Sequence, residues 1–202
     1  MGKGRSAGIE FMAQKTAGKT TGWLSYTLSK SDRKFTKGGI NNGEWFPYKY
    51  DRRHSINLTI NHKFSDRIDI GASWVFYTGG TSTIPEEKTT VIRPHNGANN
   101  GFLWYGTYDN TNSSPTIGDV SYIEHRNNFR LPASHRLNLG VNFNKKTKHG
   151  MRTWNISLYN AYNAMNPAWV YRGHNKQGLS VIKKYTLLPL IPSFTYTYKF
   201  WI

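Results

Sequence analysis

The chain of 202 residues has no cysteine, which excludes disulfides and thiolate metal sites. No apolar run approaches the ~20 residues that a membrane-spanning helix needs, and the opening MGKGRSAGIEF lacks the apolar core of a secretion signal. Acidic residues are few, since 11 Asp and Glu stand against 27 Lys and Arg and leave a formal charge of +16. This balance favours an anionic partner, either nucleic acid or a phosphate-bearing lipid.

Aromatic residues, by contrast, make up 15% of the chain, and many lie in segments that alternate apolar and polar side chains. In the last segment, FTYTYKFWI, Phe194 and Phe200 share one row with two tyrosines, and threonines occupy the other row. Such alternation is typical of a β-strand, whose side chains point to opposite faces. Strands are predicted over residues 7–13, 23–29, 55–64, 67–77, 136–144, 153–162 and 194–202.

The connections between these segments alternate in length. Three are tight, around Gly18, around Asp66 and over residues 145–150, and three are long, over residues 36–50, 81–129 and 167–184. Short turns at one end and long loops at the other are typical of outer-membrane barrels, whose tilted strands are about 10 residues long. The polar rows are mainly Asn, Ser, Thr and Gly, which suits a water-filled lumen.

The sequence therefore predicts an all-β fold, an antiparallel transmembrane β-barrel, with residues 1–202 forming one unit. Seven strands cannot close with both edges paired, and an unpaired edge is very costly in lipid. We therefore expect the chain to be the C-terminal portion of a larger barrel.

Several stretches support this interpretation through a family resemblance. SAGIEFMAQKTAGKTTGWLSYTLSKSDRKF, then FPYKYDRRH and RNNFRLPASHRLNLGVNF, resemble the last strands of TonB-dependent outer-membrane receptors. The likeness is to the Bacteroidetes branch with a carboxypeptidase-regulatory-like extension, related to SusC-type nutrient importers. One departure is that Trp201 and Ile202 follow the Tyr-x-Phe ending.

The resemblance implies a barrel of about 22 strands in the cell outer membrane of a Gram-negative bacterium. It implies import of an unknown nutrient, with the TonB complex acting only through a plug domain that these residues do not contain. Barrel-assembly machinery would read a C-terminal signal at Tyr196, Tyr198 and Phe200. We expect a transport protein and not an enzyme, with no catalytic residue, no cofactor and no metal.

Three groups of residues are candidates for contacts or chemistry. In YKYDRRH, Asp51 either forms an acid/base pair with His54 or neutralises Arg52 or Arg53 where loop meets strand. Loop aromatics could stack on a ligand while Asn supplies hydrogen bonds. The candidate ligand contacts are Trp45, Phe46, Tyr48, Trp104, Tyr105 and Tyr108. The candidate contacts to lipopolysaccharide phosphates are Arg33, Lys34, Lys37, Arg52 and Arg53.

Two alternatives remain open from the sequence. One is a small autonomous outer-membrane barrel, structural or porin-like, whose eighth strand would come from residues 81–129. The other is a basic soluble β-protein that binds nucleic acid through stacked aromatics. The aromatics share their rows with Ile, Leu and Val rather than with Lys and Arg, which argues against nucleic acid as a partner.

Overall fold

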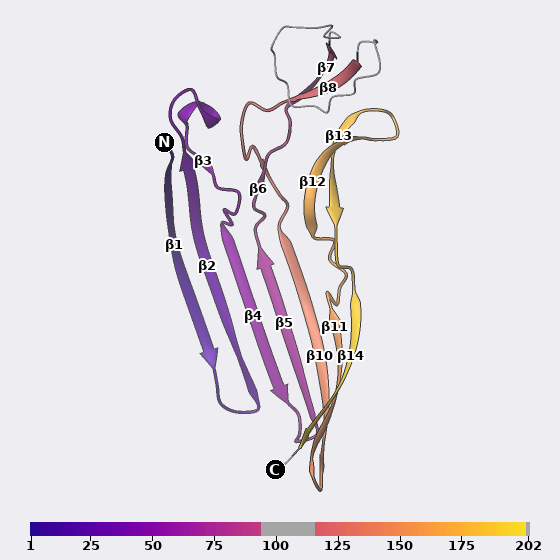
Figure 1. Ribbon diagram of the computed structural model, residues 1–202. Helices are drawn as coiled ribbons and strands as arrows, with labels where there is room; N and C mark the ends of the chain where they lie inside the picture. Colours follow the sequence, from indigo (N-terminus) through magenta and orange to yellow (C-terminus); the bar gives the residue numbers. More distant parts are fainter. Residues whose placement is uncertain (94–115, 201–202) are drawn as a thin grey trace.

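The computed structural model describes the backbone of residues 1–93 and 116–200 and the side chains of residues 1–86 and 122–200 (Figure 1). Within these parts the protein is all-β, with one short 3-10 helix, η1 (Ile40–Gly43), and every strand pair is antiparallel. No helix in the described part of the chain has the length and apolar character to cross a membrane.

Seven long strands form the main sheet, in the order β1-β2-β4-β5-β10-β11-β14, and all seven predicted strands are confirmed. The two-residue strand β3 (Phe46–Pro47) pairs with the end of β2 as an eighth member. The sheet is open, with β1 and β14 at its two edges. The long strands are β1 (Lys3–Lys15), β2 (Thr20–Lys34), β4 (His54–Lys63), β5 (Ile68–Tyr77), β10 (Ser134–Thr147), β11 (Gly150–Tyr159) and β14 (Ile191–Phe200).

Several predicted boundaries needed correction, among them the start of β14 at Ile191 rather than residue 194 and both ends of β10. Strands β1 and β2 extend further than predicted, because their backbone pairing continues to Arg5 opposite Asp32 and Lys3 opposite Lys34. The sequence shows no alternation of apolar and polar residues in this part of either strand. Strand β11 ends at Tyr159 rather than at residue 162, because Asn160 adopts a left-handed backbone conformation with φ 55°.

The tight turns and the long connections lie at opposite ends of the sheet, as predicted (Figure 1). The long connections, however, are not simple loops. The second and third contain three two-stranded sheets that pair only within themselves: β6 (Thr81–Ser82) with β9 (Phe129–Arg130), β7 (Glu87–Arg93) with β8 (Thr116–Tyr122), and β12 (Pro167–His174) with β13 (Ser180–Thr186). Within the described residues, therefore, no strand of 81–129 joins the main sheet to complete an eight-stranded barrel.

The register of the main sheet collects the apolar rows of all its long strands on one face, here called the apolar face. One row runs from Ala13 through Leu24, Leu58 and Trp74 to Leu137, each directly opposite the next. Cross-strand apolar neighbours of this kind stabilise the pairing. The opposite face, here called the polar face, carries the hydroxyl and amide rows.

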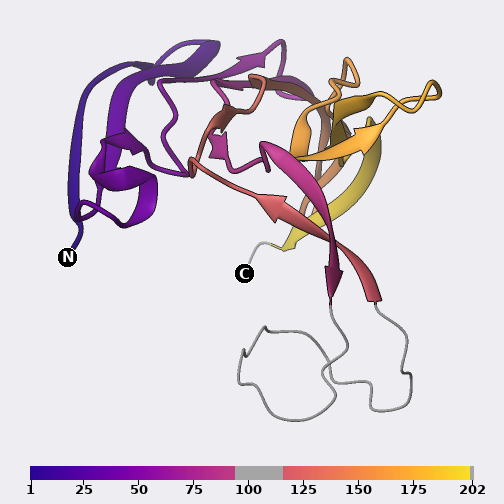
Figure 2. The same cartoon turned by 90° about the horizontal axis from the view of Figure 1, so that it is seen from above.

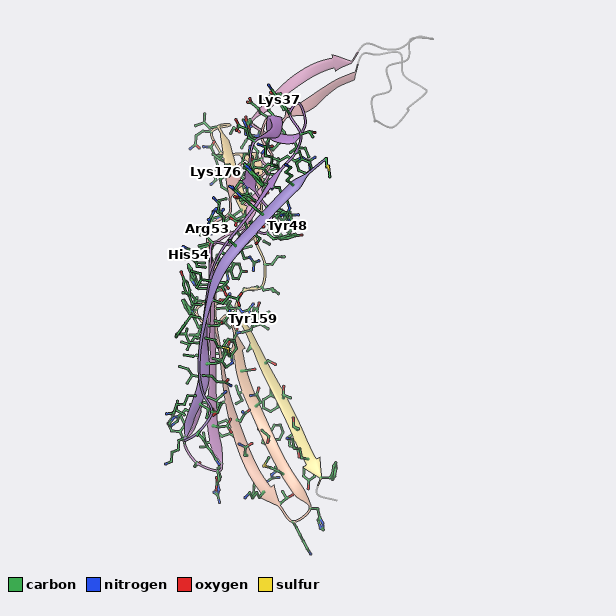
Figure 3. All side chains as sticks on the ribbon, turned by 90° about the vertical axis from the view of Figure 1, so that its left-hand side faces the viewer. Lys37, Tyr48, Arg53, His54, Tyr159 and Lys176 are labelled. Atoms are coloured by element: carbon green, nitrogen blue, oxygen red, sulfur yellow. The ribbon has the colours of Figure 1, made fainter. Side chains whose placement is uncertain are left out.

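The sheet is strongly curved, and the first long connection, which contains η1, lies on its concave side (Figure 2). Tyr48 and Tyr159 project to this concave side, whereas His54, which belongs to the apolar rows, projects to the other (Figure 3). The polar face is therefore the concave face.

Very little of the apolar surface is covered. Among the described side chains the buried apolar ones are Phe46 and Ile84, and both lie in the long connections. On the apolar face, Ile9 is 73% exposed, Phe11 58% and Phe194 64%. No second layer packs on this face in the described part of the chain, so the sheet lacks the core that a two-layer domain forms.

Candidate functional site

The end of the sheet that carries the long connections concentrates the charged and aromatic candidates. Asp51 is its most buried charged group, with a fully buried side chain. Arg130 donates from Nη2 to Asp51 Oδ2 at 2.6 Å and from Nη1 to the Asp51 and Gly79 carbonyls. The Ser31 N–H donates to Oδ1 at 2.7 Å. This arrangement joins the first and second long connections to strand β2.

The two interpretations of Asp51 can now be compared. Arg53 does lie beside it, with Nη2 3.6 Å from Oδ2, but the shorter ion pair is with Arg130, 79 residues away in the chain. His54 shares a 2.9 Å hydrogen bond with the Tyr26 hydroxyl instead. The carboxylate therefore has a structural role at the junction of the loops, and the acid/base pair is not formed in the described structure.

Asparagines cross-link the first long connection to the second. The Asn41 side chain accepts from the Arg126 N–H at 2.7 Å and donates to the Arg126 carbonyl at 3.1 Å. Asn127 donates to the Pro47 carbonyl at 2.8 Å. Asn41 and Asn127 both have positive φ, 51° and 57°, which Asn tolerates better than most residues. These bonds hold the connections together over the sheet.

The aromatic ligand candidates lie in different surroundings. Phe46 is 8% exposed and stacks on Phe35, so its ring packs inside the first connection. Trp45 is 39% exposed, with the Arg5 guanidinium 4.3 Å above its ring. Tyr48 has the Arg33 guanidinium 4.2 Å above its ring. The remaining candidates, Trp104, Tyr105 and Tyr108, lie outside the described residues.

A shallow hollow of about 380 Å³ lies between the two connections. Trp45 and Pro47 line one side, and Arg126, Asn127 and Asn128 line the other. Its lining combines aromatic rings, the Arg126 guanidinium, the Glu44 carboxylate and several amides, which are groups that can orient a polar ligand.

The candidates for lipopolysaccharide contact divide between the two faces of the sheet. Arg33 alternates with the polar rows and stacks on Tyr48, so it faces the concave side. Lys34, the next residue along β2, belongs to the apolar side. Arg52 lies over the ring of Tyr77, 4.0 Å from its centroid, on the concave side. Lys37 is exposed at the loop end. Arg53, the fifth candidate, lies beside Asp51. The five residues therefore do not form one lipid-facing set.

A second basic group lies on the apolar side, and the sequence analysis did not name its member Arg5. Arg5 and Lys30 pair with Asp32 at 2.9 and 3.5 Å, and Trp45 stacks on Arg5. Along β1 and β2 the group lies closer to the long connections than the apolar pair Ile9 and Leu28, and on the same face. The signal that could have found it is the alternation of β1 and β2, extended past the last apolar residue.

Three potential metal-ligating side chains, from Glu86, Glu124 and His125, also come within 4.8 Å of one another. The spacing of the histidines did not indicate this cluster. Both the Asn128 amide and the His125 N–H donate to Glu86 Oε1, at 3.1 and 3.2 Å. The Asn128 hydrogen bond is the main cause of the lowered pKa of Glu86. The same carboxylate oxygen is thus already engaged by neighbouring groups of the loop.

The aromatic row of the last strand packs mainly against β11. Trp154 of β11 lies 5.0 Å from Phe194 and 4.4 Å from Tyr196, measured between ring centroids. The Tyr198 hydroxyl bonds to Thr147 Oγ1 at 2.9 Å, and Phe200 remains 76% exposed. These rings stay available to a surface that covers the edge of the sheet.

The polar face has its own hydrogen-bond network near the tight turns. The Asp69 carboxylate accepts from the amides of Asn142 and Asn144 at 2.7 and 2.6 Å. Asn155 donates to Asn142 at 2.6 Å, and Thr153 donates to Asn144 at 2.7 Å. The network joins three strands, which alternation alone could not reveal.

Comparisons of the chain with protein-family models, with curated proteins and with solved structures gave no match.

Proposed function

We propose that the chain forms part of the wall of a transmembrane β-barrel in the outer membrane of a Gram-negative bacterium. The observation that carries this proposal is the uncovered apolar face, which continues from β1 to β14 opposite a face of amides and hydroxyls. Large exposed apolar surfaces mark sites that meet a membrane or another protein. A bilayer covers one face of a single sheet while water fills the lumen on the other.

The open edges support a place within a larger barrel. Strands β1 and β14 each have one neighbour in the main sheet. In hydrocarbon their outer backbone groups need further strands, because an unpaired N–H or C=O costs several kcal/mol there. Strands contributed by the rest of a larger barrel meet that need.

The barrel that the sequence motifs favour is a TonB-dependent nutrient receptor, a transport protein and not an enzyme. In this proposal the long connections and their hollow contact the nutrient at the outer surface. TonB acts through a separate plug, and the assembly machinery recognises the aromatic row of β14. The support is the combination of the motifs with the loop asymmetry seen in Figure 1.

The lipid contact is best assigned to the basic group on the apolar side. We assign lipopolysaccharide phosphates to Arg5, Lys30 and Lys34 rather than to Arg33 and Arg52, which face the concave side. Trp45 beside them suits the interface, where amphipathic rings concentrate.

The absence of cysteine allows a direct test of the orientation. Leu58 and Thr59 are neighbours on opposite faces of β4. The single variants Leu58→Cys and Thr59→Cys are made in the protein as its own gene encodes it, and any cysteine elsewhere in that protein is replaced first. Each is labelled with a fluorophore in reconstituted vesicles. The label at position 58 should be quenched by brominated lipid, and the label at position 59 by aqueous iodide. Equal aqueous quenching at both positions would overturn the proposal.

A further inference from the structure

A row of alternating cations and rings crosses the outer end of the polar face. The Arg52 guanidinium lies 4.0 Å above the Tyr77 ring, and the Arg136 guanidinium lies 4.3 Å above the Tyr159 ring. Tyr77 is opposite Ser134, two residues before Arg136 on the same strand, so the two pairs are diagonal neighbours across β5 and β10. Arg52, Tyr77, Arg136 and Tyr159 are here called the cation–ring row.

The row is held in place by its own contacts. Arg136 Nη1 donates to the Tyr159 hydroxyl, which fixes the guanidinium over the ring. Arg136 Nε is buried and has no acceptor among the described residues. Tyr159 projects to the concave side, where the lumen of a completed barrel would lie (Figure 3).

No described carboxylate neutralises this row. Asp51 is engaged by Arg130 and Arg53, and Asp69 is bonded to two asparagines near the other end of β5. Neither Arg52 nor Arg136 forms an ion pair within the described residues. The outer end of the polar face therefore combines uncompensated positive charge with ring faces.

The geometry points to a binding site for a ligand that carries a carboxylate attached to a ring. A guanidinium fork binds a carboxylate through two parallel, charge-assisted hydrogen bonds, and a tyrosine face packs against the ring beside it. The repeat of the pairing at Arg33 and Tyr48, on the same face and 4.2 Å apart, extends the site along the rim. This inference deepens the proposed function, because it gives the chemical class of the ligand that enters the lumen.

The test measures binding to the full protein, as its gene encodes it, in detergent. Two probes carry the carboxylate, a uronic-acid tetrasaccharide and a free aromatic carboxylate, and a neutral hexose tetrasaccharide is the matched control. Arg136→Gln and Arg52→Gln should each weaken binding of a carboxylate probe about tenfold and that of the neutral sugar less than twofold. Whichever carboxylate binds identifies the ring as a sugar or an aromatic.

Arg152→Gln is the matched control variant, since it removes the same charge from the same strand as Tyr159. Arg152 alternates with the apolar rows and lies near the tight turn of β11. This variant should leave binding unchanged. Arg52 is exposed, so Arg52→Gln keeps the test decisive if Arg136→Gln fails to fold.

Equal affinity for the neutral and acidic tetrasaccharides, or an equal loss in Arg152→Gln, overturns the inference. Its failure is separable from that of the proposed function, because the labels at positions 58 and 59 report membrane orientation without any ligand. Correct quenching with no carboxylate binding rejects only the site, and carboxylate binding with wrong quenching rejects only the membrane assignment.

Discussion

The two faces of the main sheet share one backbone ladder but are held by different side-chain interactions. On the polar face, Asp69 and Asn142 belong to a network of short hydrogen bonds that crosses three strands. On the apolar face, contacts such as Trp154 on Phe194 are ring stacking with wide exposure. The polar face near the tight turns is held by hydrogen bonds between its own side chains, whereas the side chains of the apolar face stay largely uncovered by the described chain, as the proposed membrane contact requires.

The largest predicted difference between the faces comes from placing a charge on each. In the proposed membrane setting, Leu58→Arg should cost about 2–4 kcal/mol, because it would put a cation in hydrocarbon near mid-strand. Thr59→Arg, on the neighbouring polar row, should cost much less. Unfolding titrations of both variants in lipid vesicles measure the difference. Equal costs on the two faces would contradict the contrast.

The buried carboxylate of Asp51, at the junction of the loops, gives the next effect. Breaking a buried ion pair costs about 3–5 kcal/mol, and we expect about 2 kcal/mol for Asp51→Ala because Arg130 keeps 36% exposure. The loss should be local, with faster hydrogen exchange in residues 46–53 and 79–84 and unchanged exchange in the centre of β10. Uniformly faster hydrogen exchange across the sheet would mean that Asp51 supports the backbone ladder of the main sheet itself.

A smaller effect is expected from the amide network. Asp69→Leu removes the acceptor for two amides and should cost about 1–3 kcal/mol, measured by denaturant unfolding. Ile70→Val, one residue along β5 on the apolar row, is the comparison and should cost about 1 kcal/mol or less. A cost for Asp69→Leu no greater than that for Ile70→Val would show that the network contributes little.

The smallest effect is a pH dependence in the loops. The pKa of Glu86 is lowered below its ordinary value of 4.5, so its ionised form stabilises the loop contact fully above that value. This contribution is lost as the pH falls through the lowered pKa. Pepsin cleavage within residues 122–128 should therefore increase as the pH is lowered from 5 to 3. Glu86→Gln should flatten that response, and an unchanged response would assign it to another group.

The strands and their two rows could be predicted from the sequence, because the face on which a side chain lies follows from alternation along one strand. The rows of the seventh segment, with Tyr196 and Phe200 on one side, needed no partner to be recognised. Strands β6 and β9 of the second long connection were missed, because each is two residues long and the two pair across 47 residues of chain. Alternation over two residues is not a signal.

The sequence by itself determined the period, the polarity of each row and the division into short turns and long connections, since all three are local properties of the chain. Only the tertiary structure decided that Asp51 meets Arg130 and that Asn41 bonds to Arg126. It also placed Tyr77 beside Arg136. These contacts depend on register and on how distant connections fold over the sheet, and neither is encoded in the spacing of residues along one strand.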